Sequence, residues 1–334
     1  MVCENDIKKF TNFVSCYNNF IIVGHKGPDG DCLCSTIALA DLLNRMGKQA
    51  FLVSAGPFVK EETLIFEKHF TSEVPDLDKN DSAVIIADCS ELHRLGNVAD
   101  SVADYPRFII DHHKTADASE DFSIIRPKSP ATCFLVQLIY EKIVGKIPEN
   151  IAKVLFFGLC TDSGFFRYLE DDSGPIFEAA SRLVQSGANP KRTYGIISSG
   201  KPAESRKWLG EMFSRMEFLF DDKLICICEE EDVAKRFGSN NRDTATLYDQ
   251  LLCIKGVEAV LFIRQDDREP SISVSSFRSV EHFDVSAIAA ELGGGGHKNA
   301  AGLSLNCTIE EAKSRILNVA KDFFDKNRNS PLKS

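Results

Sequence analysis

The sequence has no apolar run that approaches the roughly 18–20 residues needed to span a bilayer. Its first ten residues, MVCENDIKKF, also lack the basic start, apolar stretch and small-residue cleavage site of an export signal. The eleven cysteines include no Cys-x-x-Cys motif and no regular spacing, which argues against a disulfide framework. We therefore expect a soluble, cytoplasmic protein with reduced thiols and no membrane partner.

The chain is also short of positive charge. Its 39 Lys and Arg residues against 49 Asp and Glu give a formal net charge of −10. Tight binding to a long duplex nucleic acid usually needs a basic surface, so we do not expect a long duplex as partner. An anionic substrate has to be held by local groups, and a small phosphorylated molecule fits this charge balance.

The length of 334 residues favours two domains, since a single domain usually has about 100–200 residues. The apolar periodicity weakens between residues 187 and 202, where Gly, Pro and Ser gather. This places a boundary near residue 190. We predict a first domain over 1–190, a helical linker over 191–218, a second domain over 219–328 and a tail over 329–334.

Short apolar runs at 20–24, 50–54, 82–87 and 107–110 read as buried strands. They alternate with helical patterns, as over 31–46, 63–70, 130–140 and 151–160, which is typical of an α/β domain with a mostly parallel, doubly wound sheet. Strands at 224–228, 257–263, 272–276 and 303–305, with helices at 204–219, 284–291 and the C-terminus, predict a smaller mixed α/β domain. The glycines at 293–296 are expected to form a loop.

Four clusters of His and Asp are scattered over the first half of the chain, and three of them directly follow predicted strands. They are His25, Asp29 and Asp31; Asp88; Asp111, His112 and His113; and Asp162. A doubly wound fold gathers the carboxyl ends of its strands at one edge, so these side chains are expected to meet. Oxygen ligands with a few imidazoles suit Mn²⁺ or Mg²⁺ better than a structural zinc. The clusters predict a two-metal centre.

The residue types also predict roles within such a centre. Asp88 is the candidate for a carboxylate shared by two ions about 3.5–4 Å apart, which would activate a water for attack on phosphorus. One of His112 and His113 would bind metal and the other would contact a phosphoryl oxygen, while Asp111 orients a ring. Taken singly, the loop with Asp29 and Asp31 is also typical of a solvated turn, Asp88 of a helix N-cap and Asp162 of a helix-terminal carboxylate. Two adjacent imidazoles at the end of a strand, by contrast, rarely serve packing. Together they predict metal-assisted phosphoester hydrolysis.

A second motif lies near the C-terminus, where the glycine run 293–296 is followed by His297. Glycines let backbone N–H groups approach an anion closely. Ser275 and Arg278, just upstream, add a hydroxyl and a guanidinium fork suited to phosphate. The alternatives are a flexible turn for the glycines and an exposed salt bridge for Arg278.

Several cysteines flank the His and Asp clusters. Cys32 and Cys34 follow Asp31, Cys89 follows Asp88, and Cys160 precedes Asp162 by two residues. Free cysteines are commonly buried, so we expect these thiols to pack beside the site.

With these residues assembled, the chain resembles the DHH phosphoesterase superfamily along nearly its whole length. The motifs that carry the resemblance are His25-x-x-x-Asp29-x-Asp31, Asp88, Asp111-His112-His113 and Asp162, and the glycine loop with His297, which is similar to the DHH-associated C-terminal domain. The two-domain length resembles that of stand-alone oligoribonucleases that also dephosphorylate 3′-phosphoadenosine 5′-phosphate. It is equally similar to that of phosphodiesterases acting on cyclic di-AMP or its linear product.

The resemblance implies a set of ligands. His25, Asp29 and Asp88 would bind one Mn²⁺, and Asp31, Asp88, His112 and Asp162 would bind the other, with Mg²⁺ or Co²⁺ as alternatives. His113 would face the scissile phosphate, so that His113, Asp88 and Asp111 are the implied catalytic residues. Ser275, Arg278, Gly294, Gly295, Gly296 and His297 would hold the terminal nucleotide, with the active site in a cleft between the two domains.

The leading functional expectation is therefore a phosphodiesterase that hydrolyses very short RNA or linear dinucleotides such as pApA to mononucleotides, and that also acts on 3′-phosphoadenosine 5′-phosphate. A cyclic di-AMP phosphodiesterase is the principal alternative. An inorganic pyrophosphatase shares the N-terminal motifs but differs at the C-terminal end, and a non-catalytic nucleotide sensor would not need complete metal motifs. A homodimer is compatible with all of these.

Overall fold

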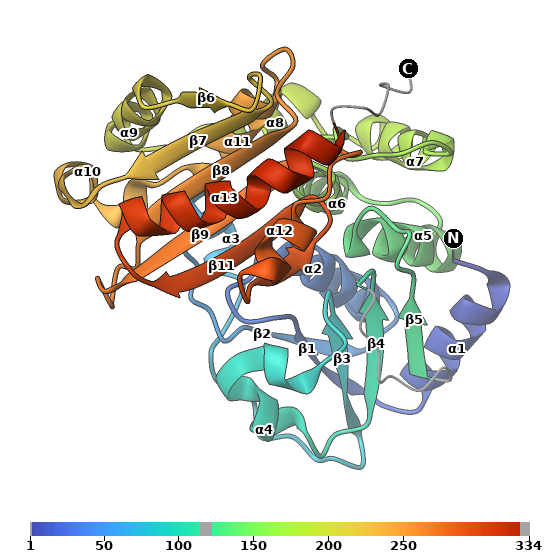
Figure 1. Cartoon of the computed structure of the whole chain (residues 1–334). Helices are drawn as coiled ribbons and strands as arrows, with labels where there is room; N and C mark the ends of the chain where they lie inside the picture. The colour runs from blue at the N-terminus through green and yellow to red at the C-terminus, as the bar shows by residue number, and fades with distance from the viewer. Residues whose placement is uncertain (1, 114–121, 328–334) are drawn as a thin grey trace. The chain divides into compact units, whose positions relative to one another are not determined.

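The structure is a computed structural model that describes residues 2–113 and 122–327 (Figure 1). The chain forms two compact units, unit 1 (Met1–Gly200) and unit 2 (Lys201–Ser334). The segment expected as a linker, 191–218, is divided between them, since one of its helices belongs to unit 1 and the next to unit 2. The tail expected over 329–334 lies outside the described residues.

Unit 1 contains α1 (Glu4–Ser15), β1 (Asn19–Val23), α2 (Gly30–Arg45), β2 (Gln49–Val53), η1 (Glu61–Thr63), α3 (Leu64–Glu67), β3 (Ser82–Ala87), η2 (Leu92–Val98), α4 (Ala99–Val102), β4 (Arg107–Asp111), β5 (Ser123–Ile125), α5 (Thr132–Val144), α6 (Glu149–Asp162), α7 (Gly174–Gln185) and α8 (Pro190–Ser198). Unit 2 contains α9 (Ala203–Ser214), β6 (Glu217–Leu219), β7 (Leu224–Glu229), α10 (Glu231–Phe237), η4 (Ser239–Asn241), α11 (Thr244–Leu252), β8 (Ala259–Gln265), β9 (Ile272–Ser279), α12 (Ser286–Glu291), β10 (Gly295–His297), β11 (Ala300–Asn306) and α13 (Ile309–Asn327).

The sheet of unit 1 has five parallel strands in the order β2-β1-β3-β4-β5. Its central strands are rich in Ile and Val and buried throughout, as expected of a parallel sheet covered on both faces. The strand order reverses direction between β1 and β3, which makes their carboxyl ends the switch point where doubly wound folds bind ligands. The predicted parallel, doubly wound sheet is confirmed.

Each face of this sheet has its own core, because successive strand residues point to opposite sides. Phe20, Ile22 and Phe108 pack in the larger core with α1, α2, α5 and α6. Ile21 and Val84 face the smaller core with η2 and α4. The central strands are thus held from both sides, which fixes the position of the residues that follow them.

Unit 2 is built on a six-stranded sheet in the order β10-β11-β9-β8-β7-β6. The β7–β8 pair is parallel and the other pairs are antiparallel. One core lies between this sheet and α12 and α13, and a second lies between β7, β8 and the helices α9 and α11. The predicted smaller mixed α/β domain is confirmed.

Three local expectations differ from the structure. The helix expected over 63–70 is only η1 and α3, and the helix expected over 204–219 ends at Ser214 and gives way to β6. The glycine run 293–296 is partly a strand, because Gly295–His297 pairs with β11. Within the described residues, no helix is long and apolar enough to cross a membrane.

Candidate functional site

The site is built at the carboxyl ends of β1 and β3, at the switch point of the parallel sheet. His25 follows β1 and is 8% exposed, and Asp88 follows β3 and is 1% exposed. Asp88 adopts a left-handed backbone conformation with φ of 64°, which is uncommon outside glycine. Such conformations concentrate at functional sites, where the surrounding structure holds them. The end of β3 therefore requires a left-handed backbone conformation at Asp88.

The start of α2 supplies two more carboxylates. Asp29 is the N-cap, and its Oδ1 accepts a hydrogen bond from the backbone N–H of Cys32 at 3.1 Å. Asp31, in the first turn, is fully buried. Its two carboxylate oxygens accept the backbone N–H groups of Thr132 at 2.6 Å and Cys133 at 2.8 Å. The N-terminus of α5, with its positive dipole end, thus holds the Asp31 carboxylate in place.

The end of β4 contributes Asp111 and the two histidines. The Nδ1 atom of His112 lies 3.1 Å from the carbonyl oxygen of Ser129, which leaves Nε2 to face the site. The Nδ1 atom of His113 lies 2.8 Å from Asp111 Oδ1, and Ser90 donates its hydroxyl to Asp111 Oδ2 at 2.5 Å. Asp111 is thus a buried anchor that orients the His113 ring.

The last acidic residue, Asp162, is brought in by close packing of α6 against α2. A Cβ on Gly30 would lie 2.5 Å from Thr161 Oγ1, and one on Gly158 would lie 2.3 Å from Cys133 Sγ. These glycines let the helices approach closely enough for the end of α6 to reach the start of α2. Asp162 is the final residue of α6, and its carboxylate lies 3.1 Å from His112 Nε2.

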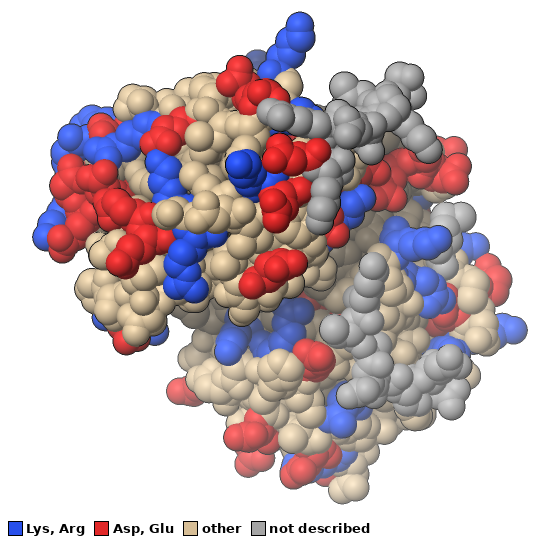
Figure 2. Space-filling view, viewed as in Figure 1, with Lys and Arg blue, Asp and Glu red and all other residues tan. Residues whose placement is uncertain are grey.

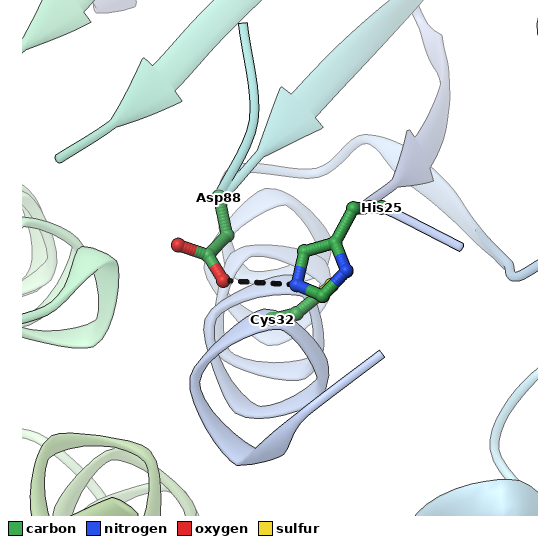
Figure 3. Close-up of side chains that lie close together, drawn as sticks. All are labelled: His25, Cys32 and Asp88. Atoms are coloured by element: carbon green, nitrogen blue, oxygen red, sulfur yellow. Dashed lines mark ion pairs between the residues drawn. The ribbon is translucent and has the colours of Figure 1, made fainter. Parts of the chain in front are cut away.

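The donor atoms lie in two neighbouring groups that share Asp88, one around His25 (Figure 3) and one around His112. In the first group, His25 Nε2 lies 3.5 Å from Asp88 Oδ2 and 3.8 Å from Asp29 Oδ1. In the second group, His112 Nε2 lies 3.5 Å from Asp88 Oδ1 and 3.1 Å from Asp162 Oδ2. The two oxygens of one carboxylate thus point toward different groups.

The electrostatics of the site are those of buried, mutually repelling anions. Burial raises the pKa of Asp31 and of Asp88 above the ordinary value for Asp, and the neighbouring carboxylates add repulsion. Burial opposes the charge on His112, but its contacts with Asp162, Asp31 and Asp88 prevail and raise its pKa to about 10. Burial likewise opposes the charge on His25, but the nearby carboxylates of Asp29 and Asp88 raise its pKa far above its usual range. The carboxylates around His25 and His112 thus favour the protonated form of both imidazoles.

These residues fit a pair of divalent cations. Metal–nitrogen and metal–oxygen bonds of about 2.0–2.2 Å allow two ligands of one ion to lie up to about 4.4 Å apart, and the donor separations in both groups fall below this limit. His112 Nε2 is buried and, within the described chain, has no hydrogen-bond partner of suitable geometry. A buried nitrogen that faces carboxylates without a hydrogen-bond partner is suited to bind a metal ion.

The residues predicted to bind substrate lie in unit 2, and the structure does not bring all of them together. His297, Ala300 and Arg278 are direct cross-strand neighbours on β10, β11 and β9, so their side chains share one face of the sheet. The Arg278 guanidinium lies 5.1 Å from the ring centre of Tyr248. Ser275, three residues from Arg278, is on the opposite face and fully buried. The expected joint role of Ser275 and Arg278 therefore has no support in the strand geometry.

The glycines of this region have a clear structural role. A Cβ on Gly294 would lie 2.4 Å from the carbonyl oxygen of Gly302, and one on Gly296 would lie 2.4 Å from that of Ala300. Gly296 also has a φ of 144°, and Gly295, between them, pairs with Gly302 across the hairpin. The close approach of β10 to β11 therefore requires glycine at 294 and 296.

Charges of both signs are interspersed over the face of the molecule drawn in Figure 2. This distribution agrees with the net charge of −10.

Sequence reasoning missed two residues that support the site. Thr132 donates its hydroxyl to Asp88 Oδ1 at 2.9 Å, and Ser90 fixes Asp111. Ser90 lies two residues after Asp88 in the sequence, and this proximity was the one indication that it could belong to the site. Nothing in the sequence near Thr132 indicates its contact with a residue 44 positions away.

Comparisons with known proteins agree with this architecture. The family model described as "DHH family, N-terminal domain" matches residues 19–159, and the "DHHA1 domain" model matches residues 206–326. A bifunctional oligoribonuclease and PAP phosphatase NrnA of Thermus thermophilus is 26% identical over 90% of this chain and 89% of its own. A probable manganese-dependent inorganic pyrophosphatase of Bacillus pumilus is 25% identical over 74% of this chain and 82% of its own.

Among solved structures, an exopolyphosphatase-related protein from Bacteroides fragilis superposes with a TM-score of 0.79 at 23% identity, covering 98% of this chain and 97% of that protein. This likeness shows the fold. The two family models together cover most of the chain, and their order matches the two units of the structure. The chain therefore belongs to the DHH family, whose members are metal-dependent phosphoesterases.

Proposed function

We propose that this chain is a two-metal phosphodiesterase that hydrolyses very short RNA and linear dinucleotides to mononucleotides. The observation that carries the proposal is the position of Asp88 between the two donor groups. Its Oδ2 lies 3.5 Å from His25 Nε2, and its Oδ1 lies 3.5 Å from His112 Nε2. One carboxylate thus links two sets of ligands, as suits a two-metal site for in-line displacement at phosphorus.

In this proposal His25, Asp29 and Asp88 hold one ion, and Asp31, Asp88, His112 and Asp162 hold the other. Mn²⁺ is the proposed ion for both positions. Two such ions would acidify a water molecule near neutral pH and neutralise charge on the phosphoryl oxygens.

The side chains around the ions have separate tasks. His113 is 37% exposed at its side chain, so it is open to solvent on the side away from Asp111. Because Asp111 binds its Nδ1 side, the Nε2 atom is the one available to a phosphoryl oxygen or a leaving group. In unit 2, Arg278 and His297 share the sheet face proposed to bind the terminal phosphate or nucleotide. We do not assign Ser275 to this surface, because it points into the core.

The choice of a short nucleotide substrate is supported by the similarity to the oligoribonuclease and PAP phosphatase of Thermus thermophilus. That oligoribonuclease and PAP phosphatase matches 90% of the chain, against 74% for the inorganic pyrophosphatase. By this similarity the same site would also dephosphorylate 3′-phosphoadenosine 5′-phosphate. The pyrophosphatase and a cyclic di-AMP phosphodiesterase are the competing functions.

The test is a substrate panel with the purified full-length chain and Mn²⁺. The panel contains pApA, a five-nucleotide RNA, 3′-phosphoadenosine 5′-phosphate, cyclic di-AMP and inorganic pyrophosphate, each followed by product analysis. We expect the highest kcat/KM for pApA or the short RNA, with mononucleotides as products. A higher kcat/KM for cyclic di-AMP or for pyrophosphate would overturn the proposal, and so would the absence of any hydrolysis.

A further inference from the structure

The first donor group contains a sulfur atom in addition to nitrogen and oxygen. One ligand atom each from His25, Cys32 and Asp88 lie within 4.8 Å of one another. Figure 3 shows the His25 ring and the Asp88 carboxylate beside the first turn of α2, which carries Cys32. Cys32 is 1% exposed, so its thiol faces this cluster and not solvent. The cluster is therefore one of mixed donor chemistry.

The fold provides a specific space for this thiol. A Cβ on Gly24 would lie 2.1 Å from Cys32 Sγ and 3.2 Å from the carbonyl oxygen of Ala87. Gly24 is the last residue before His25, and Ala87 is the last before Asp88. The sulfur thus occupies the gap between the ends of β1 and β3, beside the two residues that begin the site. A side chain at position 24 would close this gap.

Asp31 and Cys32 are consecutive, but they serve different sides of the site. Successive residues of a helix point about 100° apart. The Asp31 carboxylate is directed to the N-terminus of α5, whereas the Cys32 thiol is directed toward His25 and Asp88. The geometry of α2 alone therefore separates a hard oxygen donor from a soft sulfur donor.

The thiols of Cys34, Cys89 and Cys133, which also lie near the site, are packed in the protein interior. Cys34 and Cys133 fill the crossing of α2, α5 and α6, where a Cβ on Gly158 would meet both. Cys89 belongs to the apolar core with η2 and α4. Among the residues that the structure describes, Cys32 is the thiol that is grouped with His and Asp donors. Its surroundings thus differ from those of its neighbours in sequence.

We propose that Cys32 is a sulfur ligand of the first metal position, together with His25, Asp29 and Asp88. This inference rests on the proposed two-metal function for the existence of that position. The second position would then have nitrogen and oxygen donors alone, so the two positions differ in softness. A thiolate favours Zn²⁺, Co²⁺ and Cd²⁺, whereas carboxylates suit Mn²⁺ and Mg²⁺. On binding, the thiol proton leaves to solvent as the sulfur–metal bond forms.

The test uses Co²⁺, because a thiolate bound to Co²⁺ gives a near-ultraviolet charge-transfer band that oxygen and nitrogen ligands do not give. The full-length metal-free protein is titrated with Co²⁺ while absorbance and bound metal are recorded. We expect the band to develop with the first equivalent. It should be absent in Cys32→Ser and in Cys32→Ala, with affinity for the first equivalent reduced by about 10- to 100-fold. Cys89→Ala and Cys228→Ser are the matched controls and should keep the band.

A second measurement needs no variant. With one equivalent of Zn²⁺, X-ray absorption of the wild-type chain should show a zinc–sulfur distance of about 2.3 Å beside shorter bonds to nitrogen and oxygen. Zinc bound by nitrogen and oxygen alone would overturn the assignment of Cys32, and so would a band that survives in Cys32→Ser. If the wild-type chain bound no Co²⁺ or Zn²⁺, the proposed two-metal function itself would fail. The two failures are thus distinguishable.

Discussion

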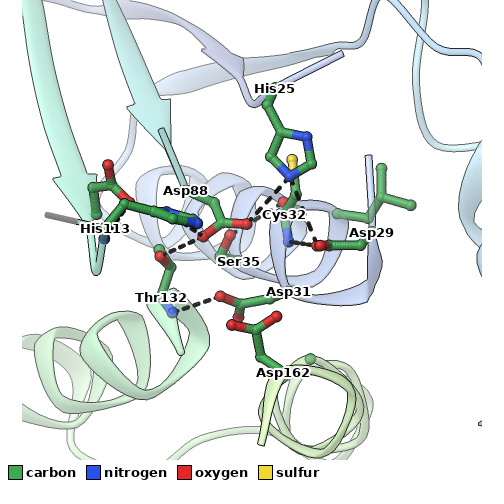
Figure 4. A network of polar contacts seen from close by, with 12 residues as sticks. His25, Asp29, Asp31, Cys32, Ser35, Asp88, His113, Thr132 and Asp162 are labelled. Atoms are coloured by element: carbon green, nitrogen blue, oxygen red, sulfur yellow. Dashed lines mark hydrogen bonds and ion pairs between the residues drawn. The ribbon is translucent and has the colours of Figure 1, made fainter. Parts of the chain in front are cut away.

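Thr132 donates its backbone N–H to the Asp31 carboxylate at 2.6 Å, although 101 residues separate them. The same residue donates its hydroxyl to Asp88 Oδ1 at 2.9 Å. Thr132 therefore contacts carboxylates of both proposed metal positions from the first turn of α5, as Figure 4 shows. Its contacts indicate a positioning role, which leads to the first prediction.

Thr132→Val should weaken Mn²⁺ binding by about 10- to 100-fold, because it removes the hydroxyl that orients Asp88 and keeps the shape of the side chain. Calorimetric titration of the metal-free protein measures the change. Thr36→Val is the matched control, because Thr36 is also buried and, within the described residues, its hydroxyl donates to carbonyl groups of α2 alone. Equal losses in the two variants would indicate a general effect on packing.

Asp88→Asn should lower kcat by roughly 10³-fold or more, because a ligand shared by two ions supplies several kcal/mol of transition-state stabilisation. Asn also tolerates the left-handed backbone at this position, whereas Ala would add strain. The metal-free variant should have a higher Tm than the wild type, since one buried negative charge is removed. Asp100→Asn, at an exposed position, should change neither property. Wild-type affinity for two Mn²⁺ ions in Asp88→Asn would refute the shared-ligand assignment.

His113→Gln should lower kcat by about 10²- to 10⁴-fold while the protein retains two bound ions. The reason is that His113 lies at the exposed side of the site, where its ring is held by Asp111. Steady-state kinetics and metal analysis on the same preparation separate the two effects. His93→Gln alters a side chain that is 77% exposed and should have wild-type kinetics. Loss of both ions from His113→Gln would contradict this role.

The metal-free protein should lose stability as the pH rises from about 6.5 toward 10. The pKa of His112 is raised to about 10 in the folded state, so the folded chain binds more protons than the unfolded chain in this range. His112 contributes fully to the free energy of unfolding below a pH of about 6.5, which is the pKa of an unfolded His. This contribution disappears as the pH rises past the pKa of about 10 that His112 has in the folded state. The raised pKa values of Asp31 and Asp88 act in the same direction.

Thermal melts after treatment with a chelator measure this loss. Each kcal/mol lost from the free energy of unfolding should lower the Tm by roughly 2–4 °C. The Mn²⁺-loaded protein should show a weaker pH dependence over the same range, because metal replaces the protons. A Tm of the metal-free protein that stays constant or rises between pH 6.5 and 10 would contradict the prediction.

Arg278→Lys should raise KM for pApA about tenfold with little change in kcat, because Lys cannot reproduce the planar guanidinium over Tyr248 or its bidentate hydrogen bonds. Arg268→Lys, in an exposed turn, is the control. The same KM in wild type and Arg278→Lys would remove Arg278 from the substrate surface.

The positions of the His and Asp clusters could be predicted because they depend on local pattern. His25 and Asp88 directly follow apolar runs. Parallel strands bring their carboxyl ends to one edge of the sheet, and this does not depend on the conformation of the loops. Asp162 was less certain from sequence, because it lies at the end of a helix and meets His112 only through the close packing of α6 on α2. Its place depends on glycines whose packing partners are far away in the chain.

The residues that support the site could not be predicted in the same way. The bond from Thr132 to Asp88 depends on where α5 packs, which no local pattern specifies. Ser275 was grouped with Arg278, although the two side chains point to opposite faces of β9. The predicted strand ended at residue 276, so the alternation of side chains along a strand was not extended to Arg278. The glycine run forms a strand because a hairpin pairs it with β11, a contact that propensity does not reveal.

The proposed ligands are spread from His25 to Asp162, over most of unit 1. During synthesis the chain emerges from its N-terminus, so the centre cannot be completed until the end of α6 has left the ribosome. Until then, the second proposed position lacks Asp162, and Asp31 and Asp88 are carboxylates without their full set of partners. Binding of the second ion would therefore stabilise only chains that have been synthesised through the end of α6.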